Sequence, residues 1–326
     1  MPGASDPTDE FAWIARLRSL TRGDARALDL RDDAAVLPSR PGYDLVITKD
    51  ALIEGVHFLD GEGPDIVARR LLRTNLSDLA AKAAEPFGYF LMTAWPKDRD
   101  GAYREAFAQG LSIDGEAFGI SLLGGDTVAT SGPLAVSATM LGWVPHGAAV
   151  LRSGARAGDR LVICGPIGDG WLGLKAARGE AIPCAAALAN HYRLPNPLLM
   201  LRVAMRRFVS AAADISDGLL ADANHIADAS GLGLEVDLDD LPLSEGARGW
   251  VTIQPERVDA LIRLAIGGDD YALACAVTPT HEVAFLAAVN ALGIAAASVG
   301  VFTEKHGLVV TSRGAKLETA MLGWRH

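Results

Sequence analysis

The 326-residue chain has few cysteines, no excess of basic residues and no long charge-free apolar helix pattern. Its three cysteines, Cys164, Cys184 and Cys275, are widely spaced, which indicates neither a disulfide framework nor a zinc site. Forty Asp and Glu against 30 Lys and Arg give a net charge of −10, which argues against a nucleic-acid-binding surface. The uncharged, alanine-rich stretch at residues 283–303 predicts a helix, a turn and a strand, not a membrane span. These absences favour a cytoplasmic protein with no nucleic-acid or membrane partner.

Two common ligand-binding loops are also missing. The chain contains no G-x-x-x-x-G-K-[ST] phosphate loop and no EF-hand calcium loop. Residues 168–173 match the pattern G-x-G-x-x-G, but no acid lies between Ala181 and Ala213, where a dinucleotide fold places its ribose-binding carboxylate. We therefore interpret residues 168–173 as a tight turn between a strand and a helix.

What the chain does contain is enough apolar sequence for two domains. Half of its residues are hydrophobic and 21% are charged, and domains of roughly 150 residues are usual. A connector rich in small residues, 153–159, follows Pro145-His146-Gly147, so we predict domains at 1–147 and 148–326. Strands and helices alternate loosely, which predicts an α/β chain of the α+β type, each domain a mixed β-sheet with helices packed on a face. Strands are expected at 44–48, 88–94, 134–144, 160–164, 232–236, 271–277, 298–302 and 308–311, and helices at 11–20, 65–84, 101–118, 170–178, 197–209, 218–230, 255–265 and 281–292.

The acids recur beside small residues at the expected strand ends and helix starts. Asp50 is expected to end a strand, and Asp126 follows a glycine pair at another strand end. Asp78 lies three residues after Asn75 in a helix, so both face one side. Any one of these acids has a structural explanation as a helix cap or an Asx turn. Together they also fit a site in which carboxylates and nucleotide phosphates share Mg²⁺ ions. The acids are Asp32, Asp33, Asp50, Asp78, Asp126, Asp214, Asp217, Asp269 and Asp270.

Seven short motifs stand out in the sequence, and six of them include these acids. They are DDAAVL at 32–37, Asp50 with GVHF at 55–58, NLSDLAA at 75–81, GGDT at 124–127, RSGA at 152–155, DISDGL at 214–219 and GGDDY at 267–271. In these motifs and their order the chain resembles the thiamine-monophosphate kinases, which belong to the aminoimidazole-ribonucleotide-synthetase-like superfamily of ATP-using enzymes. The resemblance covers residues 10–324.

The resemblance implies ATP-dependent phosphorylation of thiamine monophosphate to thiamine diphosphate by direct phosphoryl transfer with several Mg²⁺ ions. It also implies a homodimer in which the N-terminal sheets pair. Residues 1–147 would be the synthetase-like domain for ATP, Mg²⁺ and dimerisation, and residues 148–326 would complete the active site. By motif position the implied metal ligands are Asp33, Thr48, Asp50, Asp78, Asp126, Asp214 and Asp217; the ATP-binding residues are Gly125, Asp126, Arg152 and Ser216; the substrate-binding residues are His57, Asp269 and Trp324; and the catalytic residues are Asp78, Asp126 and Asp217.

The expected chemistry agrees with an acid-rich site. The accepting phosphate is already ionised, so the reaction needs charge neutralisation more than a general base. Three residues depart from the family pattern: Arg31 replaces a glycine, Lys49 a small hydroxyl residue, and Asp269 a glutamate. These departures leave open a second hypothesis, a catalytically altered or silent nucleotide- and Mg²⁺-binding member of the same superfamily.

Overall fold

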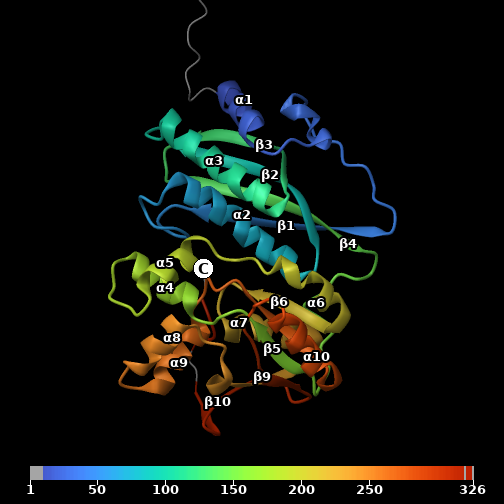
Figure 1. Ribbon diagram of the computed structural model, residues 1–326, viewed down its shortest axis with the longest axis vertical. Helices are drawn as coiled ribbons and strands as arrows, with labels where there is room; N and C mark the ends of the chain where they lie inside the picture. Colours follow the sequence, from blue (N-terminus) through green and yellow to red (C-terminus); the bar gives the residue numbers. More distant parts are fainter. Residues whose placement is uncertain (1–9, 319–320, 325–326) are drawn as a thin grey trace, which may run out of the picture. The chain divides into compact units, whose positions relative to one another are not determined.

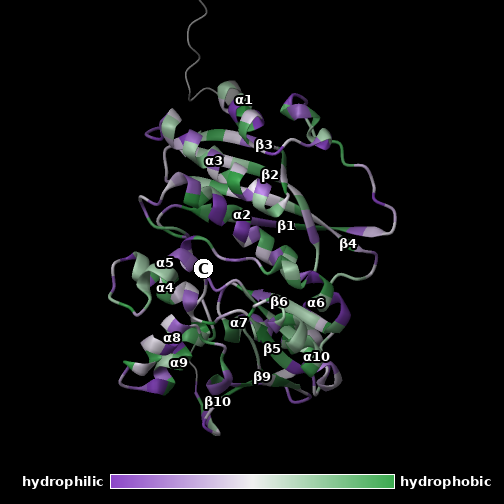
Figure 2. Ribbon diagram, in the orientation of Figure 1, coloured by the Kyte–Doolittle hydropathy of each residue, from purple (hydrophilic) through white to green (hydrophobic). Residues whose placement is uncertain are grey.

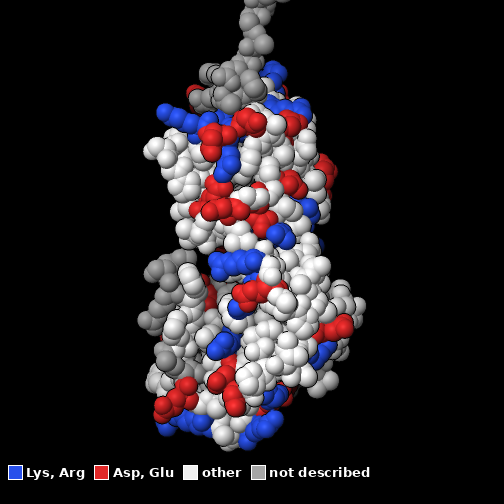
Figure 3. All heavy atoms as spheres, turned by 90° about the vertical axis from the view of Figure 1, so that its left-hand side faces the viewer, with Lys and Arg blue, Asp and Glu red and all other residues white. Residues whose placement is uncertain are grey.

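The structure, a computed structural model, describes residues 10–318 and 321–324, and the chain divides into two compact units (Figure 1). Unit 1 comprises residues 1–79 and 85–147, and unit 2 comprises residues 80–84 and 148–326. Each contains a mixed sheet with helices, which confirms the predicted fold class. Within the described part of the chain, every helix is too short or too polar to cross a bilayer. On the face drawn in Figure 3, acidic side chains lie among basic ones.

Unit 1 is built on a four-stranded sheet in the order β1-β4-β2-β3. Strand β4 pairs antiparallel with β1 and β2, whereas β2 and β3 are parallel. Burial along β1 alternates from residue to residue, which is typical of a strand with one open face. Helices α2 and α3 lie together over the sheet (Figure 1). The elements are α1 (Glu10–Leu20), η1 (Ala25–Leu30), β1 (Tyr43–Ile53), α2 (Pro64–Ala81), β2 (Glu85–Pro96), α3 (Gly101–Phe118), β3 (Ser121–Thr130) and β4 (Ala135–Pro145).

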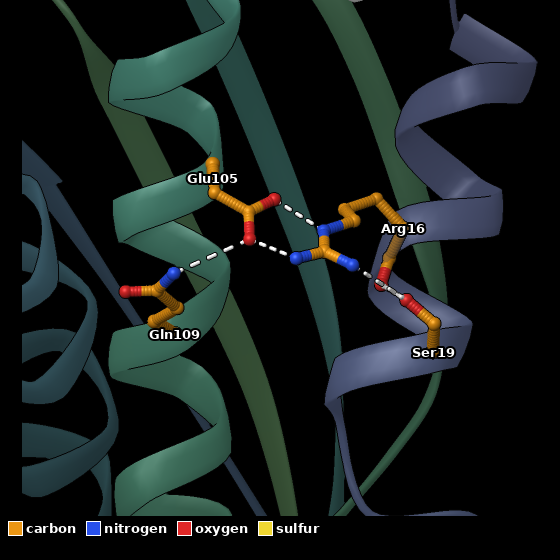
Figure 4. Close-up of polar contacts among 4 residues, drawn as sticks. All are labelled: Arg16, Ser19, Glu105 and Gln109. Atoms are coloured by element: carbon orange, nitrogen blue, oxygen red, sulfur yellow. Dashed lines mark hydrogen bonds and ion pairs between the residues drawn. The ribbon is translucent and has the colours of Figure 1, made fainter.

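Charged side chains join the helices of unit 1. The fully buried carboxylate of Asp114 in α3 lies 3.1 Å from Arg69 Nε and 2.6 Å from Arg73 Nε, both on α2. Because both of its oxygens are paired, this buried charge is compensated. Figure 4 shows a second link, in which Arg16 of α1 forms a two-pronged ion pair with Glu105 of α3. This exposed ion pair links α1 to α3.

Unit 2 contains a seven-stranded sheet in the order β11-β10-β7-β9-β5-β8-β6. Only β10 and β7 pair in parallel among its described strands. In Figure 2 its helices carry both hydrophobic and hydrophilic residues, and one side of α7, α8 and α9 packs on the core. The elements are β5 (Arg160–Cys164), α4 (Asp169–Ala177), α5 (Ala185–Arg193), η2 (Leu199–Leu201), α6 (Arg202–Phe208), β6 (Val209–Ile215), α7 (Leu219–Ser230), β7 (Gly233–Asp237), η3 (Leu238–Asp240), α8 (Glu245–Thr252), α9 (Arg257–Ile266), β8 (Ala272–Val277), α10 (Pro279–Asn290), β9 (Ala296–Thr303), β10 (Gly307–Ser312) and β11 (Ala315–Leu317).

The placement of two acids at strand ends was wrong. Asp50 lies inside β1, which continues to Ile53, and Asp126 lies inside β3. The glycine pair before Asp126 is typical of a turn in sequence, but Gly125 lies inside β3 and allows that strand to approach β2. A Cβ on Gly125 would lie 1.9 Å from the carbonyl oxygen of Leu91 on β2, so glycine permits the close approach of the two strands.

Candidate active site

In unit 1, β1 and α2 bring two carboxylates together. Asp50 and Thr48 lie two residues apart on one face of β1, and Thr48 Oγ1 donates a hydrogen bond to Asp78 Oδ2 of α2. The backbone N–H of Asp50 donates to Asn75 Oδ1 over 3.1 Å. Burial, and then the negative charge of Asp78, raise the pKa of Asp50 to about 6. The site therefore gathers oxygen donors and negative charge at one point.

This pair fits a magnesium ion without forming a complete metal site. Carboxylate and hydroxyl oxygens are the hard donors that Mg²⁺ prefers, and Asp50, Asp78 and Thr48 supply them. Among residues 10–318 and 321–324, however, no three His, Cys, Asp or Glu side chains converge as ready-made metal ligands. Phosphate oxygens would have to complete the coordination, which agrees with a site for metal–nucleotide complexes.

Other predicted residues of unit 1 lie apart from that pair. The strand register places Asp126 on the face shared with Ser137 and Ala51, opposite to Asp50. Asp33, Gly125 and Asp126 line a cavity over this open face. The ring of His57 accepts a hydrogen bond at Nδ1 from the N–H of Ile53 over 3.1 Å. That bond leaves the proton of the neutral imidazole on Nε2.

In unit 2, residues 214–218 comprise the end of β6 and the turn that follows it, and one carboxylate holds this turn in place. Oδ2 of Asp222, in the first turn of α7, accepts the N–H groups of Ser216 (3.0 Å), Asp217 (3.0 Å) and Gly218 (3.2 Å). Burial raises the pKa of Asp222 to about 6, although these N–H donors oppose the shift. Sequence reasoning missed this residue. Its signal was an acid five positions after Asp217, at the start of the helix.

The segment 267–271 packs on the same turn. The N–H of Asp269 donates to Ser216 O and that of Tyr271 to Ile215 O, each over 2.8 Å. Asp269 and Tyr271 have positive φ angles of 69° and 50°, a conformation that the neighbouring contacts must hold. The hydroxyl of Tyr271 donates to Asp269 Oδ1 over 3.1 Å, so it orients the carboxylate predicted to bind substrate.

The following residue anchors this segment to a third loop. Asp270 is buried, and its carboxylate accepts the N–H groups of Gly168 (2.8 Å) and Gly170 (2.9 Å). Burial raises the pKa of Asp270 well above its usual range. Gly168 caps the start of α4, and residues 169–173 lie inside that helix, so only the first glycine of the G-x-G-x-x-G sequence belongs to the turn between strand and helix. Gly170 permits a close approach to residues 268–269, because a Cβ at this position would lie 2.2 Å from the carbonyl oxygen of Asp269.

The C-terminal segment also reaches the 214–218 turn. The N–H of Trp324 donates to Asp217 O over 2.8 Å, and its side chain is 62% exposed. A Cβ on Gly323 would lie 2.5 Å from the same oxygen, so glycine permits the contact. Unit 2 thus brings together Asp214, Ser216, Asp217, Asp269 and Trp324. Arg152 is exposed beside Leu151, whose carbonyl accepts the N–H of Ala212 over 2.8 Å.

Comparison with known proteins shows the family to which the chain belongs. The family models "AIR synthase related protein, N-terminal domain" and "AIR synthase related protein, C-terminal domain" match residues 31–144 and 156–313. The fold and the matched segments therefore define an AIR synthase related protein. The chain is 59% identical to the thiamine-monophosphate kinase of Caulobacter vibrioides, over 100% of this chain and 92% of that protein. It is 34% identical to the thiamine-monophosphate kinase of Escherichia coli, over 97% and 98% of the two chains. The chain belongs to the thiamine-monophosphate kinase family.

Solved structures show the same relationship. The thiamine-monophosphate kinase of Stenotrophomonas maltophilia superposes with a TM-score of 0.81 at 33% identity, covering 94% of this chain and 98% of that one. The structure of AaThiL complexed with AMPPCP and TMP superposes with a TM-score of 0.77 at 27% identity, covering 97% and 96%. Escherichia coli HypE, a hydrogenase maturation protein, is 20% identical and shares the fold, with a TM-score of 0.76.

Proposed function

We propose that this chain phosphorylates thiamine monophosphate with ATP and produces thiamine diphosphate and ADP. The observation that carries the proposal is the 59% identity, over the full chain, to a thiamine-monophosphate kinase. The two carboxylate-rich sites, one in each unit, support it because phosphoryl transfer between anions needs concentrated counter-charge. The product is the finished cofactor of thiamine diphosphate biosynthesis.

The reaction is an in-line displacement. A phosphate oxygen of thiamine monophosphate attacks the γ-phosphorus of ATP, and the bond from that phosphorus to the β-phosphate oxygen breaks, so ADP leaves with the electron pair. The attacking oxygen is already ionised, which means that no side chain has to accept a proton. The protein therefore acts by positioning two phosphates and by offsetting their charge.

Magnesium ions would be held by Thr48, Asp50 and Asp78 in unit 1, with Asp33, Asp126, Asp214 and Asp217 as further ligands. When bound, such ions neutralise phosphate charge and position the reacting oxygens. Asp78, Asp126 and Asp217 are the acids that we assign to the catalytic step. Their carboxylates fix where that neutralisation takes place.

The substrates are assigned to further residues. Gly125, Asp126, Arg152 and Ser216 bind ATP, with the exposed Arg152 guanidinium suited to a phosphate. His57 and Asp269 bind thiamine monophosphate through polar contacts. Trp324 presents an exposed indole that can stack on the thiamine rings.

We further propose a cytoplasmic homodimer formed through residues 43–47 of β1, at one end of the open face of the unit 1 sheet. Three apolar side chains of β1 point out of this face: Tyr43 is 36% exposed, Leu45 40% and Ile47 58%. Exposed apolar side chains in one row are typical of an interface. Ile47→Glu would place a charge there, and we expect light scattering to show a monomer for this variant and a dimer for the wild type. A wild-type mass of 34.2 kDa at micromolar concentration would contradict the dimer.

A turnover assay tests the function directly. The purified chain is incubated with ATP, MgCl₂ and thiamine monophosphate, and thiamine diphosphate is measured by chromatography. We expect product with Mg²⁺ and none with a chelator. Nucleotide binding without product would favour the silent relative instead. Turnover of free thiamine but not of its monophosphate would indicate a different kinase.

A further inference from the structure

The open face of the unit 1 sheet carries a cavity of about 560 Å³. Apolar side chains of α1, including Trp13 and Leu17, line part of it. Asp33 and Asp126 line another part, and Lys49 is the only basic residue among the described residues that line it. A cavity with apolar, acidic and basic parts is suited to a ligand that is itself partly charged.

Lys49 is placed to act in this cavity. It pairs with Thr139 across the β1–β4 ladder and lies on the face opposite to Thr48 and Asp50. Its side chain is exposed, and among the described residues it has no ion-pair partner. A lysine that neither packs nor pairs gives little stability to the fold, so its charge is available to a ligand.

Ser137 is a second, independent pointer to a ligand. It lines the same cavity and is only 2% exposed, and its Oγ has no hydrogen-bond partner among the described residues. A buried hydroxyl without a hydrogen-bond partner is unfavourable, and a ligand oxygen that accepts its proton would remove this cost. Ser137 pairs with Ala51, two residues from Lys49, so the two side chains are diagonal neighbours about 7–8 Å apart at their Cα atoms. The lysine stem can span that separation.

We propose that Lys49 and Ser137 form a phosphate-binding subsite in this cavity. The ammonium of Lys49 offsets the repulsion that Asp33 and Asp126 exert on a phosphate, and the Ser137 hydroxyl donates to a phosphate oxygen. The choice of ligands rests on the proposed function, which names ATP and thiamine monophosphate. Both carry a phosphate group that this pair of residues can recognise. Neither residue belongs to the motifs that match the family pattern.

Binding without turnover tests the subsite. Dissociation constants of a non-hydrolysable ATP analogue and of thiamine monophosphate are measured separately by calorimetry, with and without MgCl₂, for the wild type, K49M, K49R and S137A. Lys97, exposed just after β2, is outside the cavity, so K97M is the matched control. Melting temperatures are recorded for every variant, since a purely structural role would change these and leave affinity alone.

We expect K49M to weaken the binding of one of the two ligands by about 10- to 100-fold. S137A should weaken the binding of the same ligand by about 2- to 10-fold. K49R should stay within about 5-fold of the wild type because it keeps the charge. Weaker binding of the ATP analogue assigns the subsite to the nucleotide, and weaker binding of thiamine monophosphate assigns it to the acceptor. K49M and K97M with equal affinities for both ligands would overturn the proposal. A wild type that binds these ligands and forms no thiamine diphosphate would instead refute the proposed function.

Discussion

Two carboxylates whose pKa is raised to about 6, the half-buried Asp50 in unit 1 and the buried Asp222 in unit 2, have opposite surroundings. Asp50 faces another carboxylate, Asp78, which opposes its charge. Asp222 faces three backbone N–H groups, which favour its charge. Burial is the main cause of the raised pKa in both, so the pKa alone does not separate their roles.

The two acids differ in whether the protein itself supplies partners for their negative charge. The contacts of Asp222 are complete within unit 2, so its task is to hold the backbone that carries Ser216 and Asp217. The pair of Asp50 and Asp78 concentrates negative charge and is stabilised when a cation binds. Unit 2 therefore presents a preformed turn, whereas unit 1 presents a site that a metal completes. Three experiments test this contrast.

The largest expected effect is on catalysis in unit 1. Asp78→Asn removes one charge from the proposed metal site, and we expect kcat to fall by at least about 100-fold, because metal-based charge neutralisation contributes several kcal/mol. The variant should stay folded, since Asp78 lies outside the buried core and its repulsion of Asp50 is relieved. Kinetics and a melting curve check this. Near-normal turnover would show that the metal assignment is wrong.

A smaller effect is expected from the turn of unit 2. Asp222→Ala leaves three N–H donors without their acceptor, and we expect activity to fall by about 10-fold and the free energy of unfolding by about 1–3 kcal/mol. Asp222→Asn keeps an acceptor oxygen and should lose much less. Asp228, exposed on the same helix, provides the control D228A. If D222A and D228A gave the same activity and urea midpoint, Asp222 would have no role in holding the turn.

The smallest effect concerns pH and stability. The pKa of Asp50 is raised in the folded state, so the protein is most stable with Asp50 protonated and loses stability as pH rises from about 4 through about 6. Without metal, Asp50→Asn should therefore be more stable than the wild type at pH 7, by about 1–3 kcal/mol, and equal to it near pH 4. Urea unfolding in a chelator measures both. A difference that did not change with pH would contradict the raised pKa of Asp50.

The sequence predicted most elements but missed those whose residues are unusual for their structure. Strand β3 contains Gly124 and Gly125, which suggest a turn, and β6 contains three consecutive alanines, which suggest a helix. Both strands are formed because neighbouring strands approach closely: Gly125 lies against Leu91 of β2, and the alanines of β6 pair with β8. Helices α5 and α8 were also missed.

The sequence by itself determined the mixed α/β class, the family and the motifs that contain the acids, because these depend on residue type and order along the chain. Only the tertiary structure decided which acids are neighbours. It brought Asp50 close to Asp78 and put Asp126 on the opposite face of the sheet. It also placed Asp222 and Tyr271 in hydrogen bonds with Asp217 and Asp269, two residues predicted from motifs. Burial and hydrogen bonding depend on contacts between segments far apart in sequence, and one chain without its fold does not contain that information.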